Sequence, residues 1–183
     1  ARAAELRGIL DGDAPAPAGL ALDADLRWSW LAALAATGHA AETDADAELS
    51  RDDTATGRTA WIRVRASRPE AAARAVAWDA AWNDRELTND HLAATIGGFH
   101  AGESRPLVAG CDAEYFARIR DAWAERSIEI ARRLVVGLFP SSDSLEPVDA
   151  WLRQNADAPG ALRRLVVEQR DHLARDLRVR ALQ

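Results

Sequence analysis

Residues 89–100, with the sequence NDHLAATIGGFH, contain the residue types that most readily suggest chemistry in this chain. His91 and His100 stand near its two ends as potential metal ligands, and Gly97 and Gly98 could belong to a phosphate-binding loop. Such a loop, however, places its glycines between a strand and the N-terminus of a helix. No strand pattern precedes these glycines, so a phosphate site is not expected here.

A helix explains the same stretch better. Thr88 or Asn89 is a typical N-cap residue. The apolar residues that follow recur at helical spacing, at Leu92, Ile96 and Phe99. Because glycine commonly ends helices, we predict that this helix stops at Gly97-Gly98.

The sequence predicts no metal site. The four histidines are scattered and none begins the zinc motif H-E-x-x-H. Glu168 and His172 lie four residues apart and could share a helix face, but two ligands do not make a site, and a surface ion pair is the simpler interpretation.

One cysteine, Cys111, excludes an intramolecular disulfide and a multi-cysteine zinc site. This agrees with a reducing compartment, so we expect a cytoplasmic location. Cys111 could act as a nucleophile with His100, although nothing in their local spacing suggests it. A small buried side chain is the interpretation we favour for Cys111.

Composition argues against a nucleic-acid partner. The 183 residues carry a net charge of -6, and every basic residue is arginine. Arg63, Arg65 and Arg68 could form a local basic patch, but a solvated helix face is the interpretation we favour. No apolar run approaches the roughly 20 residues that cross a bilayer, so no membrane partner is expected.

Helical periodicity dominates the chain, and no segment alternates as a strand would. Trp78 and Trp82 lie on one helical stripe that we expect to be buried, and Ser67 to Glu70 resemble a capping box that opens the helix. Asp23 is a candidate cap of an earlier helix. Roughly ten helices with short connections predict an all-α stack of antiparallel helical hairpins, either a bundle or a curved solenoid.

The first 21 residues differ from the rest. We interpret residues 1–21 as the tail end of a preceding helix, with little to pack against, followed by a loop. Residues 22–183 are then the helical domain. The chain lacks methionine altogether, so we expect it to be a piece of a longer protein.

Several stretches together resemble the C-terminal helical domain of the aminopeptidase N family, which are zinc aminopeptidases of the gluzincin type. The similarity is to the bacterial, actinobacterial-type branch and extends to the C-terminal domain of the endoplasmic-reticulum aminopeptidases. The matching stretches are residues 53–57, the helix around Trp78, residues 87–89 leading to residues 96–99, Tyr115-Phe116, residues 123–131 and residues 137–140.

The resemblance implies a HEAT-like or armadillo-like superhelix that walls a peptide chamber beside an upstream catalytic domain of the same polypeptide. Zinc would then belong to that catalytic domain. The family's H-E-x-x-H and G-x-M-E-N motifs are absent from this chain. The neighbours of Tyr115 match the helical domain and not the context of the family's catalytic tyrosine. No catalytic role is therefore transferred to any residue.

Arg126 and Glu129 are the candidate peptide-binding residues within the matching stretches. They lie three positions apart and could form an ion pair within one helix, which is the interpretation we favour. Alternatively, Arg126 could face the chamber and bind a peptide carboxylate in a bidentate manner.

The sequence thus predicts a non-catalytic domain of a zinc aminopeptidase, which helps to bind peptide while the parent protein is the enzyme. The alternative is a free-standing helical-repeat scaffold that binds a protein partner. The two differ in whether the reading frame continues upstream into a peptidase domain.

Overall fold

A computed structural model describes residues 2–182, which form eleven α-helices and one short 3-10 helix without any strand. The all-α prediction is therefore confirmed. The helices are α1 (Arg2–Asp11), α2 (Ala24–Ala36), α3 (Glu42–Arg51), α4 (Ala55–Ser67), α5 (Ala71–Asn83), α6 (Asn89–Phe99), α7 (Arg105–Val108), η1 (Ala109–Cys111), α8 (Asp112–Glu125), α9 (Ile128–Gly137), α10 (Glu146–Gln154) and α11 (Gly160–Arg180).

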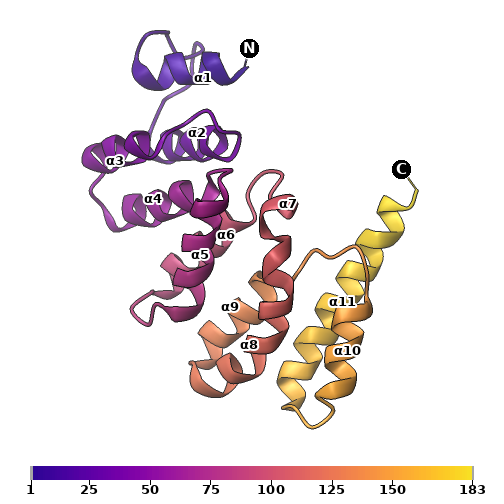
Figure 1. Cartoon of the computed structure of the whole chain (residues 1–183). Coiled ribbons are helices and arrows are strands. Elements are labelled where there is room, and N and C mark those ends of the chain that lie inside the picture. Colours follow the sequence, from indigo (N-terminus) through magenta and orange to yellow (C-terminus); the bar gives the residue numbers. More distant parts are fainter. Residues whose placement is uncertain (1, 183) are drawn as a thin grey trace.

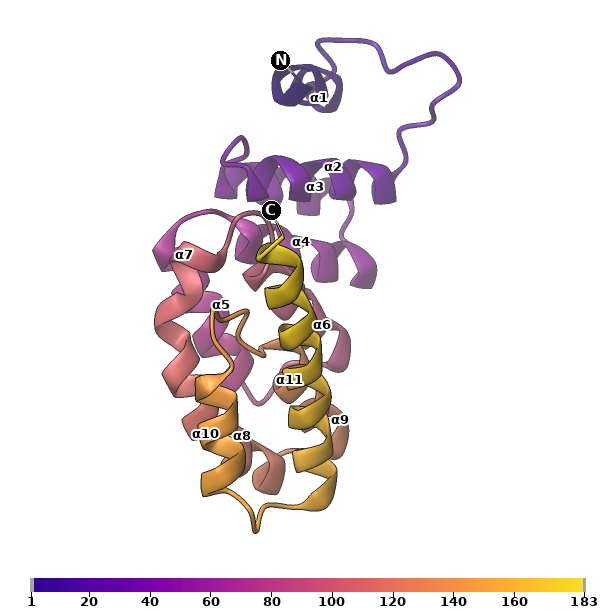
Figure 2. The same cartoon turned by 90° about the vertical axis from the view of Figure 1, so that its right-hand side faces the viewer.

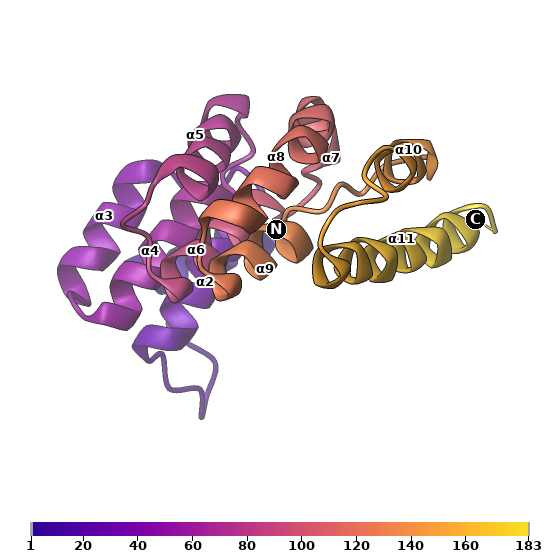
Figure 3. The ribbon, with the colours of Figure 1, turned by 90° about the horizontal axis from the view of Figure 1, so that it is seen from below.

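The helices from α2 onward form two layers. In one layer α2, α4, α6, α9 and α11 follow one another, each in contact with the next (Figure 1). In the other layer, each helix packs on a helix of the first layer: α3 on α4, α5 on α6, α8 on α9, and α10 on α11. The view from below shows this arrangement (Figure 3). Successive helical hairpins are thus stacked side by side, and the HEAT-like or armadillo-like curvature of the stack stays a prediction.

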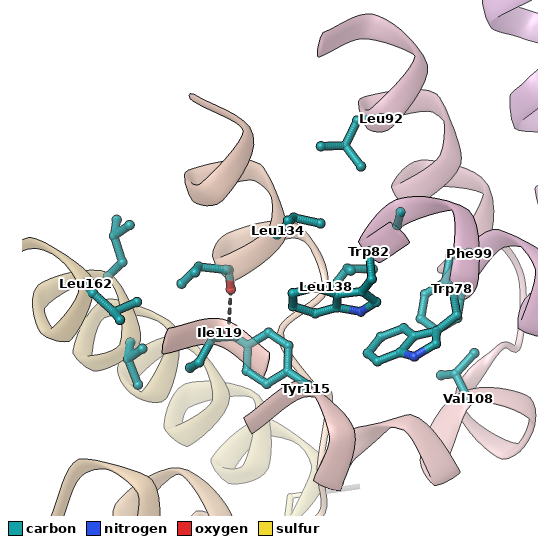
Figure 4. Close-up of a cluster of buried hydrophobic side chains, with 14 of the residues drawn as sticks. Trp78, Trp82, Leu92, Phe99, Val108, Tyr115, Ile119, Leu134, Leu138 and Leu162 are labelled. Carbon is teal, nitrogen blue, oxygen red and sulfur yellow. Dashed lines mark hydrogen bonds between the residues drawn. The ribbon is translucent and has the colours of Figure 1, made fainter. Parts of the chain in front are cut away.

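The main hydrophobic core lies between these layers from α4 to α11 and is rich in aromatic side chains (Figure 4). The ring of Trp78 lies 5.4 Å from that of Phe99, and the ring of Trp82 meets that of Tyr115 edge-on at 6.4 Å. The Tyr115 hydroxyl donates to the carbonyl oxygen of Val135 at 2.6 Å. Trp78 and Trp82 are 6% and 5% exposed, so their predicted burial is confirmed.

A second, smaller core joins α2, α3 and α4. Its buried members are Trp28, Leu31, Ala35, Ala45 and Val64. The indole of Trp28 donates to Asp52 at 2.8 Å, and the Thr54 hydroxyl donates to the other oxygen of the same carboxylate at 2.7 Å. Thr54 also accepts from the backbone N–H of Gly57 at 3.0 Å, so this sequence motif forms the N-terminus of α4.

Two predicted helix starts are confirmed and one is wrong. The side chains of Asp23 and Thr88 cap α2 and α6. Ser67, however, is the last residue of α4, and its hydroxyl donates to the carbonyl oxygen of Arg63 at 2.7 Å. A serine hydroxyl can bond within its own helix as well as cap the next one. The predicted capping box with Glu70 therefore does not form, and α5 begins directly after Glu70.

The glycine pair in α6 does not stop the helix, which continues through Gly97 and Gly98 to Phe99. Neither glycine has a positive φ. A Cβ atom on Gly98 would lie 2.5 Å from the Cβ of Ala66 and 2.6 Å from the carbonyl oxygen of Arg63. The missing side chain therefore lets α4 and α6 approach each other closely, and the prediction of a glycine stop is wrong.

Arg74 is a buried cation, with only 2% of its surface exposed. Its guanidinium donates to the carbonyl oxygens of Ser67 at 2.7 Å and Ala101 at 2.8 Å, and also to that of Gly98. These carbonyls belong to the C-terminal end of α4, the end of α6 and the turn after α6. The last carbonyls of a helix have no partner within it and carry partial negative charge, so Arg74 satisfies groups that would otherwise be buried alone.

The first helix is not without packing partners, contrary to expectation. Ile9 and Leu10 are each 7% exposed. Arg7 forms an ion pair with Asp44 of α3 at 2.6 Å. The predicted division of the chain after residue 21 stays a prediction.

Candidate functional site

Arg126 directly follows α8, and its side chain contacts the C-terminal end of α5. Its guanidinium donates to the carbonyl oxygens of Trp82 and Asp84, both at 3.1 Å. Burial and the nearby positive charge of Arg85 lower the pKa of Arg126. The guanidinium thus serves as a C-terminal cap for α5, whose own last turn contains no basic residue.

The favoured ion pair between Arg126 and Glu129 does not form. The chain changes direction between them, because α8 ends at Glu125 and Ser127 caps the start of α9. Glu129 instead pairs with Arg133 one turn later in α9, at 2.9 Å. The two candidate residues therefore belong to two different surroundings.

Glu129 lines a groove between α6 and α9, which we call the α6–α9 groove. Its volume is about 390 Å³, and its lining residues are Ala93, Ile96, Gly97, Glu129, Arg132, Arg133, Val136 and Gly137. Gly137 makes the close approach of the two helices possible, because a Cβ atom there would lie 2.8 Å from Cγ2 of Ile96. The groove is therefore built by the packing of α6 on α9.

Positive charge surrounds this apolar groove. Arg132 is exposed and, within residues 2–182, has no carboxylate within 4.0 Å. Arg63 of α4 likewise has no such partner in the described part, and its guanidinium carbon lies 3.6 Å from the position of a Cβ on Gly97. Glu129, already paired with Arg133, is the one acidic residue of the lining. The groove can therefore accept an apolar group that carries a negative charge beside it.

Arg126 lines a separate, polar hollow of about 270 Å³ at the ends of α5 and α8. Arg85 and Arg118 are also part of its lining. Both are paired with carboxylates: Arg85 with Glu125 at 3.1 Å, and Arg118 with Glu114 at 2.8 Å. The positive charge of this hollow is thus largely balanced, in contrast to that of the α6–α9 groove.

Sequence reasoning identified Glu129 but missed Arg132 and the apolar half of the groove. The groove residues come from two segments separated by about 30 positions, and only the packing of α6 on α9 brings them together. Arg132 lies three positions after Glu129, so the sequence did not mark it as an arginine without an acidic neighbour.

Comparison with known proteins identifies the family to which this chain belongs. The family model described as "ERAP1-like C-terminal domain" matches residues 1–175. The chain belongs to this family. The Aminopeptidase N of Streptomyces lividans is 41% identical to it over 180 residues, which are 96% of this chain and 21% of the relative. The chain thus spans about a fifth of that protein's length, and the predicted resemblance is confirmed.

In this ERAP1-like domain, Cys111 and His100 line the same small cavity, of about 10 Å³. A cavity of this size holds at most one water molecule. Burial and the neighbouring Glu114 and Asp112 raise the pKa of the Cys111 thiol, which keeps it protonated. Burial lowers the pKa of His100. The pair therefore has neither the space nor the thiolate that nucleophilic catalysis requires.

The residues of this domain do not fit a zinc ion. Within residues 2–182, no group of three or more His, Cys, Asp or Glu side chains could hold a metal. Glu168 pairs with Arg164, one turn earlier in α11, at 3.0 Å. This ion pair replaces the predicted one between Glu168 and His172, which lies one turn later. No chemical step in this domain is therefore assigned to zinc.

The positive charge of Arg63, Arg65 and Arg68 is mostly neutralised, in line with the favoured interpretation of a solvated helix face. Arg65 and Arg68 both pair with Glu42 of α3, Arg68 at 2.8 Å. Only Arg63 of the three is left without a carboxylate in the described residues, and it lies beside the α6–α9 groove. Among residues 2–182, no helix is both long and apolar enough to cross a bilayer.

Proposed function

We propose that this chain is the non-catalytic C-terminal domain of a zinc-dependent aminopeptidase and that it walls the chamber in which peptides bind. The observation that carries the proposal is the 41% identity to the Aminopeptidase N of Streptomyces lividans over nearly the whole chain. The parent protein would remove N-terminal residues from peptides, with zinc held in an upstream catalytic domain. There the metal would activate water. The single cysteine supports a cytoplasmic location.

Within this domain, the α6–α9 groove is the proposed peptide contact. Its apolar lining would bury a side chain of the peptide, and Arg132 would attract a carboxylate next to that side chain. Binding energy from such a distant contact can orient the scissile bond in the catalytic domain. The groove would therefore matter for long peptides and not for substrates of one residue.

Arg126 stays a second proposed peptide contact. Two of its guanidinium nitrogens already donate to backbone carbonyls, so only its remaining N–H groups are free for a ligand. For this reason we propose that its contribution to peptide binding is smaller than that of Arg132.

The alternative function, a free-standing scaffold for a protein partner, would use the same surface without any peptidase. The length of the relative, of which this chain matches 21%, favours the enzyme domain over the scaffold. Sequencing the gene upstream of residue 1 separates the two, because the scaffold requires that no peptidase domain precede it.

The decisive experiment measures kcat/KM of the full-length protein across a peptide length series and for an aminoacyl reporter. We expect hydrolysis that a chelator abolishes. Arg132→Gln should lower kcat/KM for long peptides by roughly fivefold and leave the reporter unchanged, since an exposed charge-assisted contact contributes about 1 kcal/mol. Arg126→Ala should act in the same direction with a smaller effect.

Arg164→Gln is the matched control, because Arg164 is a highly exposed arginine on α11 whose only ion-pair partner within residues 2–182 is Glu168. It should leave every rate unchanged. Absence of any aminopeptidase activity would contradict the whole proposal. Equal proportional losses at every peptide length in Arg132→Gln would leave the domain as a structural support without a peptide contact.

A further inference from the structure

The side chain of His100 joins the C-terminal ends of α6 and α9. His100 directly follows α6, and its ring donates a hydrogen bond to the carbonyl oxygen of Gly137, the last residue of α9. The same ring meets that of Phe99 edge-on at 5.0 Å. The two helices lie side by side in the stack (Figures 1 and 2). One imidazole ring therefore bridges the ends of two neighbouring helices.

The surroundings of this ring do not favour a positive charge. The small cavity that His100 lines is also lined by Arg105 of α7, Cys111 of η1 and Asp112 of α8. Asp112, the acidic residue of this lining, accepts two hydrogen bonds of 2.7 Å from Arg105, so its charge is already compensated. Burial and the positive charge of Arg74 in α5 lower the pKa of His100. A protonated His100 would therefore be a second cation beside Arg74 without a carboxylate of its own.

The helix ends that His100 joins also form the α6–α9 groove. Gly137 lines the groove from α9, and a Cβ atom there would lie 2.8 Å from Cγ2 of Ile96. Gly97, three positions before His100, lines the groove from α6. Arg63 of α4 lies against Gly97 and adds positive charge on this side of α6. A change in the contact between His100 and Gly137 would therefore alter the spacing of the helices that form the groove.

We propose that His100 is an acid-sensitive contact: when its ring takes up a proton from water, the ring leaves the cavity for solvent and the ends of α6 and α9 separate. A charge that stays buried without a partner is strongly unfavourable, whereas an imidazolium in water is fully solvated. Separation opens the cavity that Cys111 also lines. Peptide binding in the α6–α9 groove would weaken at the same time, and this second part rests on the proposed function.

The thiol of Cys111 is a probe of this separation. Dithiodipyridine reacts with thiols even in mildly acidic solution, so the labelling rate of Cys111 in the full-length protein, read by mass spectrometry, reports opening of the cavity. Relative to a small thiol at the same pH, labelling should rise roughly tenfold from pH 7.5 to pH 5.5. This is the factor by which proton uptake by an exposed imidazole, with a pKa of about 6.5, favours the open state over that range.

His100→Gln should remove this pH dependence, because a glutamine amide can donate to the carbonyl oxygen of Gly137 but does not titrate. His172→Gln is the matched control, since His172 is an exposed histidine of α11, and this variant should keep the tenfold rise. The proposal is overturned if the unmodified protein is labelled equally fast at both pH values, or if the rise persists in His100→Gln.

Native-state hydrogen exchange of the unmodified protein tests the separation without a variant. After correction for intrinsic rates, amides at the end of α9, such as that of Leu138, should lose protection at pH 5.5 while those of α2 keep theirs. Equal loss of protection in both helices would overturn the proposal, because the pH change would then act only through unfolding of the whole domain.

The effect on the groove is measured as the ratio of kcat/KM for a long peptide to that for the aminoacyl reporter. This ratio should fall between pH 7.5 and pH 5.5 in the unmodified protein and not in His100→Gln. A constant ratio, together with faster labelling of Cys111, would overturn the effect on the groove and leave the acid-sensitive contact standing. Labelling and exchange use no peptide substrate, so failure of the contact is distinguishable from failure of the peptidase proposal.

Discussion

Two regions of this helical stack differ in the balance of the forces that stabilise them. Residues 1–54, with α1 to α3, contain eleven Asp and Glu but four Arg, whereas residues 55–183 contain eighteen and nineteen. In the first region, ion pairs such as that of Arg27 with Glu48, at 2.6 Å, join helices around a small core. In the second, aromatic and aliphatic side chains fill a core that extends from α4 to α11.

Because of this difference, the stability of the two regions should respond to different perturbations. A core of large side chains loses stability when volume is removed and is not weakened by the screening of charges. Helices joined by partly exposed ion pairs lose stability when charges are screened or neutralised. The variants below separate the two regions by these responses.

Trp78→Ala should have the largest effect. It removes a buried indole from the main core and with it the hydrogen bond from the indole nitrogen to Glu114, at 2.9 Å. Such truncations cost about 3 to 5 kcal/mol, so the chemical denaturation midpoint should fall sharply. An unchanged midpoint would mean that the main core does not depend on this side chain.

Arg74→Met should follow, with a loss of roughly 2 to 4 kcal/mol, because three carbonyl groups at the ends of α4 and α6 lose their donors. Arg74→Lys should restore little of this, since one ammonium cannot reproduce the fixed fork of a guanidinium. The free energy of unfolding checks both variants, with Arg164→Gln as the control. Full rescue by lysine would show that charge alone matters at this position.

Gly98→Ala should cost roughly 1 to 3 kcal/mol, because the added methyl group would overlap Ala66 and the backbone of Arg63. Gly110→Ala is the matched control, since a Cβ on Gly110 would meet no atom within 4 Å. Thermal unfolding of the two variants gives the comparison. Equal stability would contradict the close approach of α4 and α6.

The smallest expected effect is a difference in the pH range over which each region loses stability. Burial lowers the pKa of His100 in the second region, so the unfolded chain binds the proton first, and stability should fall as pH drops below about 6.5. The hydrogen bond from Arg7 lowers the pKa of Asp44 in the first region, so its contribution is lost only below about pH 4, as the pH passes through the lowered pKa.

Denaturation midpoints measured from pH 8 to pH 3 check this order. His100→Gln should flatten the change near pH 6, and Asp44→Asn should flatten the change below pH 4. The order is wrong if His100→Gln leaves the slope near pH 6 as it is.

Local signals in the sequence predicted the helices well and their ends less well. Thr88 was identified as a cap because its hydrogen bond reaches only three residues along the chain. The roles of Ser67 and Gly98 were predicted wrongly, because each residue type has two uses. A serine hydroxyl can cap the next helix or bond within its own, and a glycine can end a helix or let two helices approach closely. Which use applies depends on neighbours in space, such as Ala66 across the helix contact from Gly98.

The candidate site was predictable only in part for a related reason. Glu129 was identified, but its expected partner Arg126 lies on the other side of a change in chain direction. Arg132 becomes a site residue only when α6 and α9 meet. Contacts between segments distant in sequence leave no pattern at helical spacing, so they could not be inferred from one sequence.

Arg74 has a consequence for protein engineering. Arrays of helical hairpins are often treated as modular, so that a repeat can be added or removed while its neighbours keep their structure. Here one guanidinium from α5 is shared by the ends of α4 and α6 and the following turn. A cut or insertion between these hairpins would leave the guanidinium of Arg74 or its carbonyl acceptors buried without a hydrogen-bond partner. Helical hairpins should therefore be removed or added only at places outside α4 to α6.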